Sequence, residues 1–222
     1  MSENNLFDLF TGEEEKITKA SKISGIVVGI VSSNNDEENL GRIKVTFPWH
    51  SDVNESDWIR VSNPMAGNGR GNLFIPEVGE EVICGFIHGD INRPICLGSL
   101  YGIENKPPIE TNDGKNNIKR IKTRSGHTIT LNDKSSNESI SIQSKSGHSV
   151  TFDDAVGREK IIVKDKNGQN TIEIDSLANS ISINSALNLD LKATNINIHA
   201  TGIMNIKANA MLKIEGIPIM LN

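Results

Sequence analysis

Alternating apolar and polar residues recur at a fixed distance through the middle of the chain. The segment 125–133 (SGHTITLND) returns as 146–154 (SGHSVTFDD) and, more loosely, as 167–175 (NGQNTIEID), and its glycines lie 21 residues apart each time. A fixed period indicates one small structural unit stacked on itself. Each unit holds two alternating runs, such as Ile140/Ile142, and alternation is typical of half-buried strands. The pattern therefore predicts an elongated stack of short strands.

After residue 175 the apolar pairs recur in steps of seven or eight residues. A unit this short supplies only one face of a prism and cannot bury its apolar edge within one chain. Three chains around one axis supply the other two faces, so we expect residues 118–222 to form an intertwined, triple-stranded β-helix in a homotrimer. The side chains expected in the trimer core are Ile181, Ile183, Leu189, Leu191, Ile196, Ile198, Met204, Ile206, Leu212 and Ile214.

The first half of the chain has the pattern of a small β domain. Strand-like runs separated by loops rich in Asn, Asp and Gly cover 23–32, 41–48, 57–62, 80–88 and 94–100. Five or six short strands over residues 21–104, with no convincing helix, predict a closed barrel of the OB type. Residues 105–117 contain Pro107 and Pro108 and are expected to be a linker. Residues 1–20 form an acidic tail with one apolar segment, either disordered or a short helix that docks on a partner subunit.

Composition narrows the functional classes. Hydrophobic residues make up 36% of the 222 residues and aromatics only 4%, which suits a thin stack better than a broad core. The net charge of −5 and the absence of a basic run disfavour nucleic-acid binding. No apolar run is long enough to span a membrane, and the N-terminus does not resemble a secretory signal. We expect synthesis in the cytoplasm, where Cys84 and Cys96 are reduced, buried and opposed across a hairpin.

Candidate chemistry is sparse, and the sequence predicts no catalytic residues, no cofactor and no metal site. His127 and His148 occupy the same place in two repeats, which favours a role in turns or between layers over catalysis. The pairs Asn132-Asp133 and Asp153-Asp154 each follow a strand end, which favours hydrogen bonding within a turn, with a calcium site as the alternative. His199 should point outward, so an axial metal is disfavoured.

Two features of the barrel segment leave other ligands open. The loop 67–71 (GNGRG) resembles a phosphate cradle, but it lacks the Lys-Ser/Thr of a P-loop and opens no helix. Trp49 and Trp58 could stack on bases, although the acidic balance of the chain argues against this. His50 and His88 carry no recognisable catalytic motif.

The barrel segment contains a series of motifs in a fixed order: 41–49 (GRIKVTFPW), 57–61 (DWIRV), 64–71 (PMAGNGRG), 74–82 (FIPEVGEEV) and 89–101 (GDINRPICLGSLY). This order resembles the VgrG and phage baseplate assembly protein V family, which provides central spikes of contractile tails and injection systems. The segment 122–127 (KTRSGH) is similar to the start of that family's triple-stranded β-helix.

The resemblance implies a structural central spike, not an enzyme, that joins a baseplate hub to a piercing tip and punctures a target envelope. Few residues precede the barrel, so the hub is expected to be a separate protein, and the linker leaves no room for a lysozyme domain. Inner tube and baseplate components and a PAAR-like tip cap are the other expected partners, with no nucleic acid and with envelope contact only on firing. The expected cap-docking residues are Gly216, Ile217, Pro218, Ile219, Met220, Leu221 and Asn222.

The spike would assemble in the cytoplasm as part of a phage-tail-like particle that can also be released from the cell. The sequence leaves open whether the parent is a phage, a tailocin, an extracellular injection system or a type VI apparatus. Two other functions stay open as well: a carbohydrate-binding or enzymatic β-helix module with an OB-fold, and a static adhesin or fibre.

Overall fold

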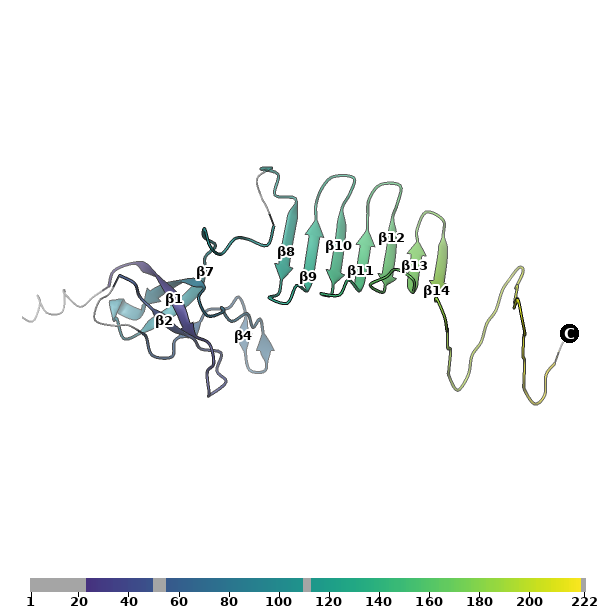
Figure 1. Ribbon diagram of the computed structural model, residues 1–222, viewed down its shortest axis with the longest axis horizontal. Coiled ribbons are helices and arrows are strands. Elements are labelled where there is room, and N and C mark those ends of the chain that lie inside the picture. The colour runs from purple at the N-terminus through teal and green to yellow at the C-terminus, as the bar shows by residue number, and fades with distance from the viewer. Residues whose placement is uncertain (1–22, 50–54, 110–112, 221–222) are drawn as a thin grey trace, which may run out of the picture. The chain divides into compact units, whose positions relative to one another are not determined.

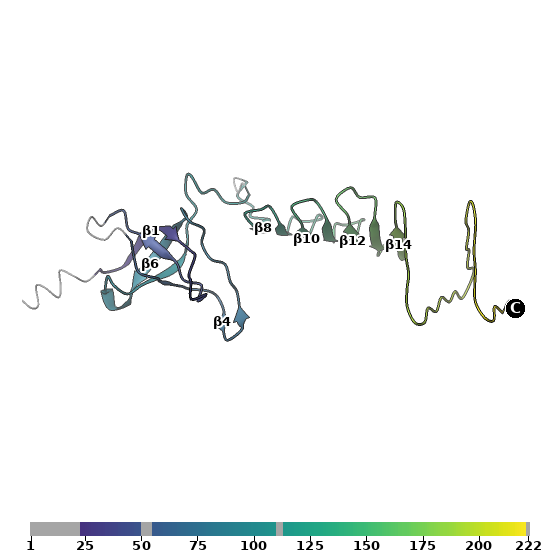
Figure 2. The same ribbon diagram turned by 60° about the horizontal axis from the view of Figure 1, so that its bottom comes forward.

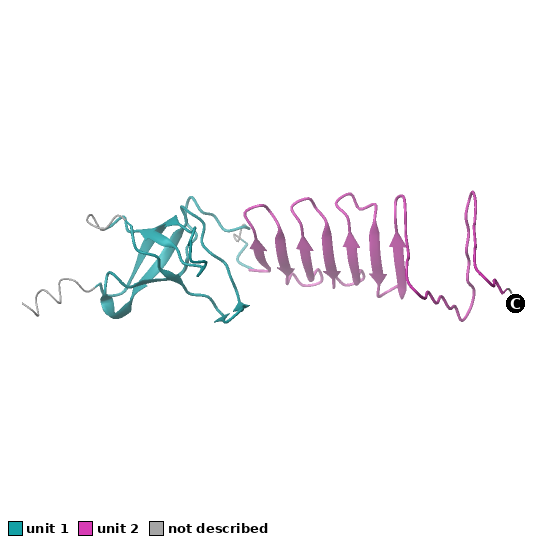
Figure 3. Cartoon of the chain, turned by 90° about the horizontal axis from the view of Figure 1, so that it is seen from below, with its two compact units in different colours: residues 1–115 teal, residues 116–222 magenta. Residues whose placement is uncertain are grey.

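A computed structural model describes residues 23–49, 55–109 and 113–220. The chain divides into two compact units, Met1–Lys115 and Asn116–Asn222, coloured separately in Figure 3. The described residues form strands, loops and one 3₁₀ turn, η1 (Ile87–Gly89), so the predicted all-β class is confirmed. Among them, no helix is long and apolar enough to cross a membrane. The acidic tail and His50 lie outside the described residues.

The first unit contains the predicted OB barrel. Its sheet has the order β2-β1-β6-β7-β3, and β3 pairs with β7 in parallel whereas the other neighbours are antiparallel. Ile43 and Ile59 exchange backbone hydrogen bonds of 3.0 and 2.8 Å, which join the two outer strands and close the barrel. The strands are β1 (Ile26–Ser33), β2 (Lys44–Thr46), β3 (Arg60–Val61), β6 (Glu81–Phe86) and β7 (Pro94–Ser99).

The barrel core consists of apolar side chains that point inward from these strands. Alternation along β6 buries Val82 and Cys84, and Cys84 lies opposite Cys96 of β7. Both cysteines are free thiols with no exposed surface, as the sequence predicts. The other core residues are Val31, Ile43, Val45, Phe47 and Ile59.

Asp36 organises the loop that leads from β1 towards β2. Its carboxylate accepts backbone N–H groups of Glu38, Leu40 and Arg42, and it also accepts the Arg42 guanidinium at 3.0 and 2.7 Å. The hydrogen bond from the Arg42 side chain is the main reason why the pKa of Asp36 lies far below its ordinary value, with burial acting against it. Because these donors come from the loop itself, one carboxylate fixes the path of the chain before β2.

The segment that resembles a phosphate cradle is a hairpin instead. β4 (Ala66–Gly67) and β5 (Arg70–Gly71) form a separate two-stranded sheet. Gly69 has φ of 66° and Gly71 has φ of 144°, conformations that glycine adopts at low cost. The glycines of this segment are therefore accounted for by a tight turn.

The second unit is a single antiparallel sheet in which every strand pairs with its sequence neighbour (Figure 1). Each 21-residue repeat supplies two strands, one tight turn at one edge of the sheet and one longer loop at the other, so the predicted stack of short strands is confirmed. The strands are β8 (Ile118–Lys122), β9 (Thr128–Asn132), β10 (Ser139–Gln143), β11 (Ser149–Asp153), β12 (Lys160–Lys164), β13 (Thr171–Asp175) and β14 (Ser180–Asn184).

The described residues 185–220 add no strand to this sheet. The sequence predicts further strands there, but in one copy of the chain the apolar pairs of this segment have no neighbouring strand to bond with. The triple-stranded β-helix is thus not confirmed by the single chain, and it remains a proposal. Figure 2 shows the sheet of the second unit obliquely, with the connecting loops rising to one side of the strands.

Candidate functional site

The most unusual surface of the second unit is one face of its sheet. The strand register aligns apolar side chains into two rows that cross successive strands, because each residue pairs with its counterpart on the next strand. We call these two rows the apolar face. The first row is Ile121, Ile129, Ile142, Val150, Val163, Ile172 and Ile183; the second is Leu131, Ile140, Phe152, Ile161, Ile174 and Ile181.

The apolar face is open to solvent in the single chain. Ile142 is 49% exposed and Phe152 40% exposed, although residues of these types are usually buried. The opposite face carries mostly polar residues, such as Thr130 and Ser141, and these are less exposed than the apolar rows. A continuous apolar surface of this kind marks an interaction site.

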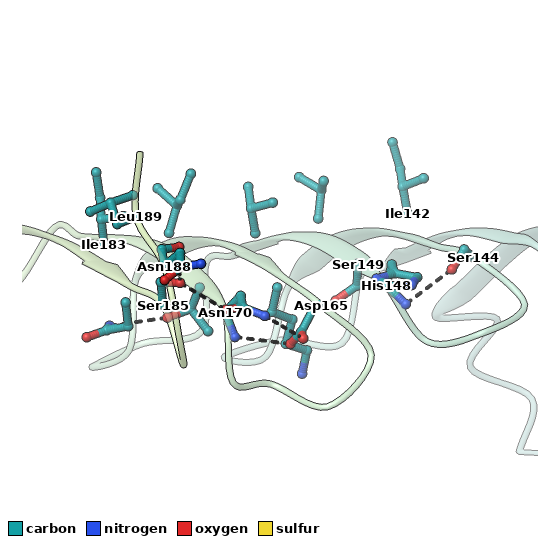
Figure 4. A pocket seen from close by; sticks show the side chains of 16 residues that line it. Ile142, Ser144, His148, Ser149, Asp165, Asn170, Ile183, Ser185, Asn188 and Leu189 are labelled. Carbon is teal, nitrogen blue, oxygen red and sulfur yellow. Dashed lines mark hydrogen bonds between the residues drawn. The ribbon is translucent and has the colours of Figure 1, made fainter. Parts of the chain in front are cut away.

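An open groove of about 710 Å³ extends along this face near its C-terminal end. Ile142, Val150, Val163, Ile172 and Ile183 line it from the sheet, and Leu189 closes it from the segment after β14. In Figure 4 the labelled Ile142, Ile183 and Leu189 project to one side, whereas His148, Asp165 and Asn170 lie on the other. The groove therefore belongs to the apolar face and presents hydrocarbon to whatever fills it.

Three equivalent turns build one edge of the sheet, which we call the turn edge. In the first two, Thr123 and Ser144 use their hydroxyl groups to accept the N–H of His127 and His148, at 3.0 and 3.1 Å. Asp165 takes the same place 21 residues later and accepts the N–H groups of Gln169 and Asn170. The backbone N–H of Asn170 is the main reason why the pKa of Asp165 is lowered.

The turns also bond to one another. The Nδ1 atom of His127 accepts the backbone N–H of Lys145 at 3.2 Å, and Oδ1 of Asn170 accepts that of Ala186 at 3.0 Å. A role for His127 between layers is thereby confirmed. His148 shares the turn geometry, with Gly147 at φ 98° beside it. These contacts stack the turns one above the next.

Longer loops form the opposite edge, which we call the loop edge. Asn132, Asp153 and Asp175 each end a strand and accept the backbone N–H two residues on, at 2.9–3.0 Å. The turn chemistry predicted for Asn132 and Asp153 is confirmed. Within the described ranges, no three acidic, His or Cys side chains gather as a metal site would require.

The residues expected in the trimer core fall into two groups. Ile181 and Ile183 lie on β14 and end the two apolar rows. The other eight lie in residues 185–220, outside any strand, and each is more than 40% exposed in the single chain. Of the expected tip residues, Ile217 and Met220 are almost fully exposed, and Leu221 and Asn222 lie outside the described residues.

Other sequence candidates have local structural roles. The ammonium of Lys44 lies 5.4 Å from the centre of the Trp58 ring, and Trp49 packs with its ring centre 5.9 Å from that of Phe47. His88 has φ of 55° within η1, and His199 lies in the strandless segment. The Asp36–Arg42 pair was not predicted from the sequence. An acidic residue followed six residues later by an arginine within one loop was the pattern that could have indicated it.

Comparison with known proteins adds the family context. Residues 27–101 match the family of the type VI secretion system/phage-baseplate injector OB domain. The type VI secretion system spike protein VgrG3 of Vibrio cholerae is 35% identical over 131 residues, which cover 54% of this chain and 13% of VgrG3. The spike protein VgrG1a of Pseudomonas aeruginosa is 35% identical over 130 residues, which cover 54% of this chain and 20% of VgrG1a.

A third relative is named as a toxin. The actin cross-linking toxin VgrG1 of Vibrio cholerae is 34% identical over 131 residues, which cover 54% of this chain and 12% of VgrG1. The chain therefore matches a fifth or less of the length of each of these relatives. The activities in their names describe those whole proteins, whereas the shared part covers 54% of this chain.

Proposed function

We propose that the chain is the structural central spike of a contractile injection system or phage-tail-like particle, because its residues 27–101 match the type VI secretion system/phage-baseplate injector OB domain. Three copies form the spike, which joins the baseplate hub to the piercing tip and punctures the target envelope. Its task is mechanical, and no bond-breaking step is assigned to its residues.

The single observation that carries this proposal is the exposed apolar face. One sheet cannot cover its own rows, and leaving Ile142, Phe152 and their neighbours in water is unfavourable by about 25 cal/mol per Å². Three sheets that turn these faces to a common axis bury both rows at once. Aliphatic side chains such as Ile and Val pack in a narrow prism without the space that aromatic rings need.

The same arrangement accounts for the segment after β14. Residues such as Leu189, Ile198 and Ile206 are exposed in the single chain. Their seven- or eight-residue spacing gives one face per unit, so equivalent segments of two other copies supply the missing strand neighbours. Satisfying the backbone N–H and C=O groups between chains favours three interlocked copies over a dimer of sheets.

A shaft of this kind suits force transmission. Continuous ladders across β8 to β14, and an apolar interior held by three chains, leave few places for local unfolding. In the particle, the barrels contact the baseplate hub and the inner tube, and the shaft points to the envelope. Assembly takes place in the cytoplasm, and the particle punctures its target either from inside the producing cell or after release from it. Nucleic acid has no part in the proposal.

The far end of the shaft is proposed to bind a PAAR-like cap. Ile217, Ile219 and Met220 are apolar and at least half exposed, and three copies would present them as one small apolar platform. Deleting residues 216–222 should leave the trimer intact and abolish cap binding in a pull-down. Undiminished binding by the truncated trimer would place the docking site elsewhere.

Native mass spectrometry of the full chain tests the central proposal. The expected species is a trimer of the 24.2-kDa chain, with little folded monomer on dilution. Electron microscopy of the assembled particle should place it on the particle axis. A folded monomer, a face-to-face dimer or a position at the particle rim would contradict the proposal. Binding on a glycan array would instead support a carbohydrate-binding module.

A further inference from the structure

The two edges of the seven-stranded sheet carry opposite charge. The turn edge, residues 122–127, 143–148 and 164–170, contains one acidic residue, Asp165, whose carboxylate is bound within its own turn. Its basic residues are all exposed: Lys122, Arg124, Lys145, Lys164 and Lys166. Folding of a single copy does not require the two edges of the sheet to differ in charge.

Three of these basic residues are placed by the repeat itself. Arg124, Lys145 and Lys166 follow the capping residues of three successive turns and lie 21 residues apart. Successive turns are separated by two strands, so the three cations are spaced about 9.6 Å apart along the edge. We call this row the basic ladder.

The loop edge has the complementary character. Its acidic residues are Asp133, Glu138, Asp153, Asp154, Glu159 and Asp175. Of the basic residues beside them, Lys119 pairs with Asp133, Arg158 donates to Oδ1 of Asn137 at 3.2 Å, and Lys160 pairs with Glu173 at 3.4 Å. These three cations are held within their own copy. With Lys134, which is exposed, the edge has four basic residues against six acidic ones and remains predominantly acidic.

Because each strand pairs with its sequence neighbour, turns and loops alternate along the direction that crosses the strands, and the two sets of charges alternate with them. The turns join β8 to β9, β10 to β11 and β12 to β13, whereas the loops join β9 to β10, β11 to β12 and β13 to β14 (Figure 1). Along the sheet, Lys145 therefore lies at a level between the loop that contains Glu138 and the loop that contains Asp154. Lys166 likewise lies between the second and third loops.

A threefold axis converts this pattern into an interface. When three sheets turn their apolar faces to one axis, the turn edge of each copy meets the loop edge of the next, because a cyclic contact joins two different surfaces. The three sheets then share one height, so the basic ladder of each copy faces the acidic loop edge of the neighbouring copy. Opposite charges meet along this contact, whereas like charges meet if one copy is inverted.

We propose that the basic ladder of one copy and the acidic loop edge of the next form the seam between copies and set their common orientation. The proposal rests on the homotrimer proposed above. A second copy is favoured over an anionic membrane surface or other polyanion because every cationic edge comes with an acidic edge of matching repeat. A polyanion large enough to bind one ladder would also meet the acidic edge beside it.

Charge reversal with rescue tests the seam. One variant carries Arg124→Glu, Lys145→Glu and Lys166→Glu; a second carries Glu138→Lys and Asp154→Lys; a third combines all five changes. Each of the first two should lower the melting temperature of the trimer and speed its dissociation about tenfold or more, since weak charge pairs recur at three interfaces. The combined variant should recover most of the loss.

Controls separate the seam from general charge effects. Lys106→Glu with Lys115→Glu reverses two exposed cations outside the sheet and should leave trimer dissociation unchanged. Raising NaCl should destabilise the wild-type trimer and bring the wild type and the single-edge variants closer together. Dissociation should be followed by native mass spectrometry after mixing isotope-labelled and unlabelled trimers.

The outcomes distinguish this inference from the function on which it depends. If the wild type is not a trimer, the proposed function itself fails. A trimeric wild type with single-edge variants of equal stability, or with no recovery in the combined variant, would overturn the seam alone. The same holds if the ladder variant keeps its trimer stability but loses binding to vesicles that contain phosphatidylglycerol, because the ladder would then be a membrane-binding surface.

Discussion

Cys84 on β6 lies directly opposite Cys96 on β7, and neither side chain has any exposed surface. Burial is the main cause that raises the pKa of the Cys84 thiol to about 12, with the neighbouring Cys96 adding to it. Burial also raises the pKa of Cys96. The pair is therefore part of the barrel core and is held in the thiol form at neutral pH.

We predict that folded protein resists thiol alkylation. The thiolate is the reactive form, and at pH 8 the raised pKa of Cys84 leaves only a very small fraction of it ionised. Iodoacetamide should add nothing to the native chain during an incubation that labels both cysteines in guanidinium chloride, as read by intact mass. Glutathione in the same tube is the control for reagent activity. One label per native chain would show that a thiol is accessible.

Substitutions at two adjacent residues of one strand test whether the apolar face is buried in the trimer. Ile142 lies on the apolar face, whereas Gln143 follows it on β10 and points to the other side. In a trimer, Ile142→Asp brings three carboxylates into a dry interior, which costs on the order of several kcal/mol. Gln143→Asp should change stability by about 0.5 kcal/mol or less. Equal melting temperatures for the two variants would contradict an inward-facing Ile142.

The Asp36–Arg42 pair predicts a pH dependence of the barrel. The pKa of Asp36 is lowered on folding, so its contribution is full above the ordinary aspartate pKa of about 3.9. That contribution is lost as the pH falls through the lower, folded-state value. Asp36→Asn should lower the melting temperature by several degrees at neutral pH, and the difference from wild type should shrink at strongly acidic pH. A constant difference across the pH range would show that charge is not the cause.

A substitution at Gly29 tests how closely β1 and β2 approach each other in the barrel. A Cβ atom there would lie 2.3 Å from Cγ1 of Val45, whereas one on Gly98 would meet nothing within 4 Å. Gly29→Ala should destabilise the barrel by about 1–3 kcal/mol through overpacking. Gly98→Ala should be neutral or slightly stabilising, because alanine loses less backbone freedom than glycine. Thermal unfolding of both variants is the measurement, and similar losses would argue against a steric cause.

Local pattern accounts for much of what the sequence predicted correctly. The alternation of residues such as Ile140 and Ile142 sets which side chains share a face, and the 21-residue period sets where the turns fall. The buried Cys84 and Cys96 followed from their places on either side of one turn. These features depend on neighbours along the chain, so a single sequence contains the needed information.

Other features needed tertiary structure because they join residues that are distant in sequence. The bridge between Ile43 and Ile59 closes the barrel, although β2 and β3 are much shorter than the apolar runs that predicted them. The hairpin at 67–71 arises from glycine conformations, and the Asp36–Arg42 contact depends on how a loop folds back. Patterning specifies which residues are apolar, but chain closure and loop geometry decide what each of them meets.

The sheet of the second unit also has some features that the sequence determines and others that only the tertiary structure determines. The sequence by itself determined that its strands are half apolar and that basic residues recur with the turns. Only the register of β8 to β14 decided that the apolar side chains form two continuous rows and that the two edges differ in charge. The physical reason is that register fixes the partner of every residue across strands, and a shift by one residue would send each row to the opposite face.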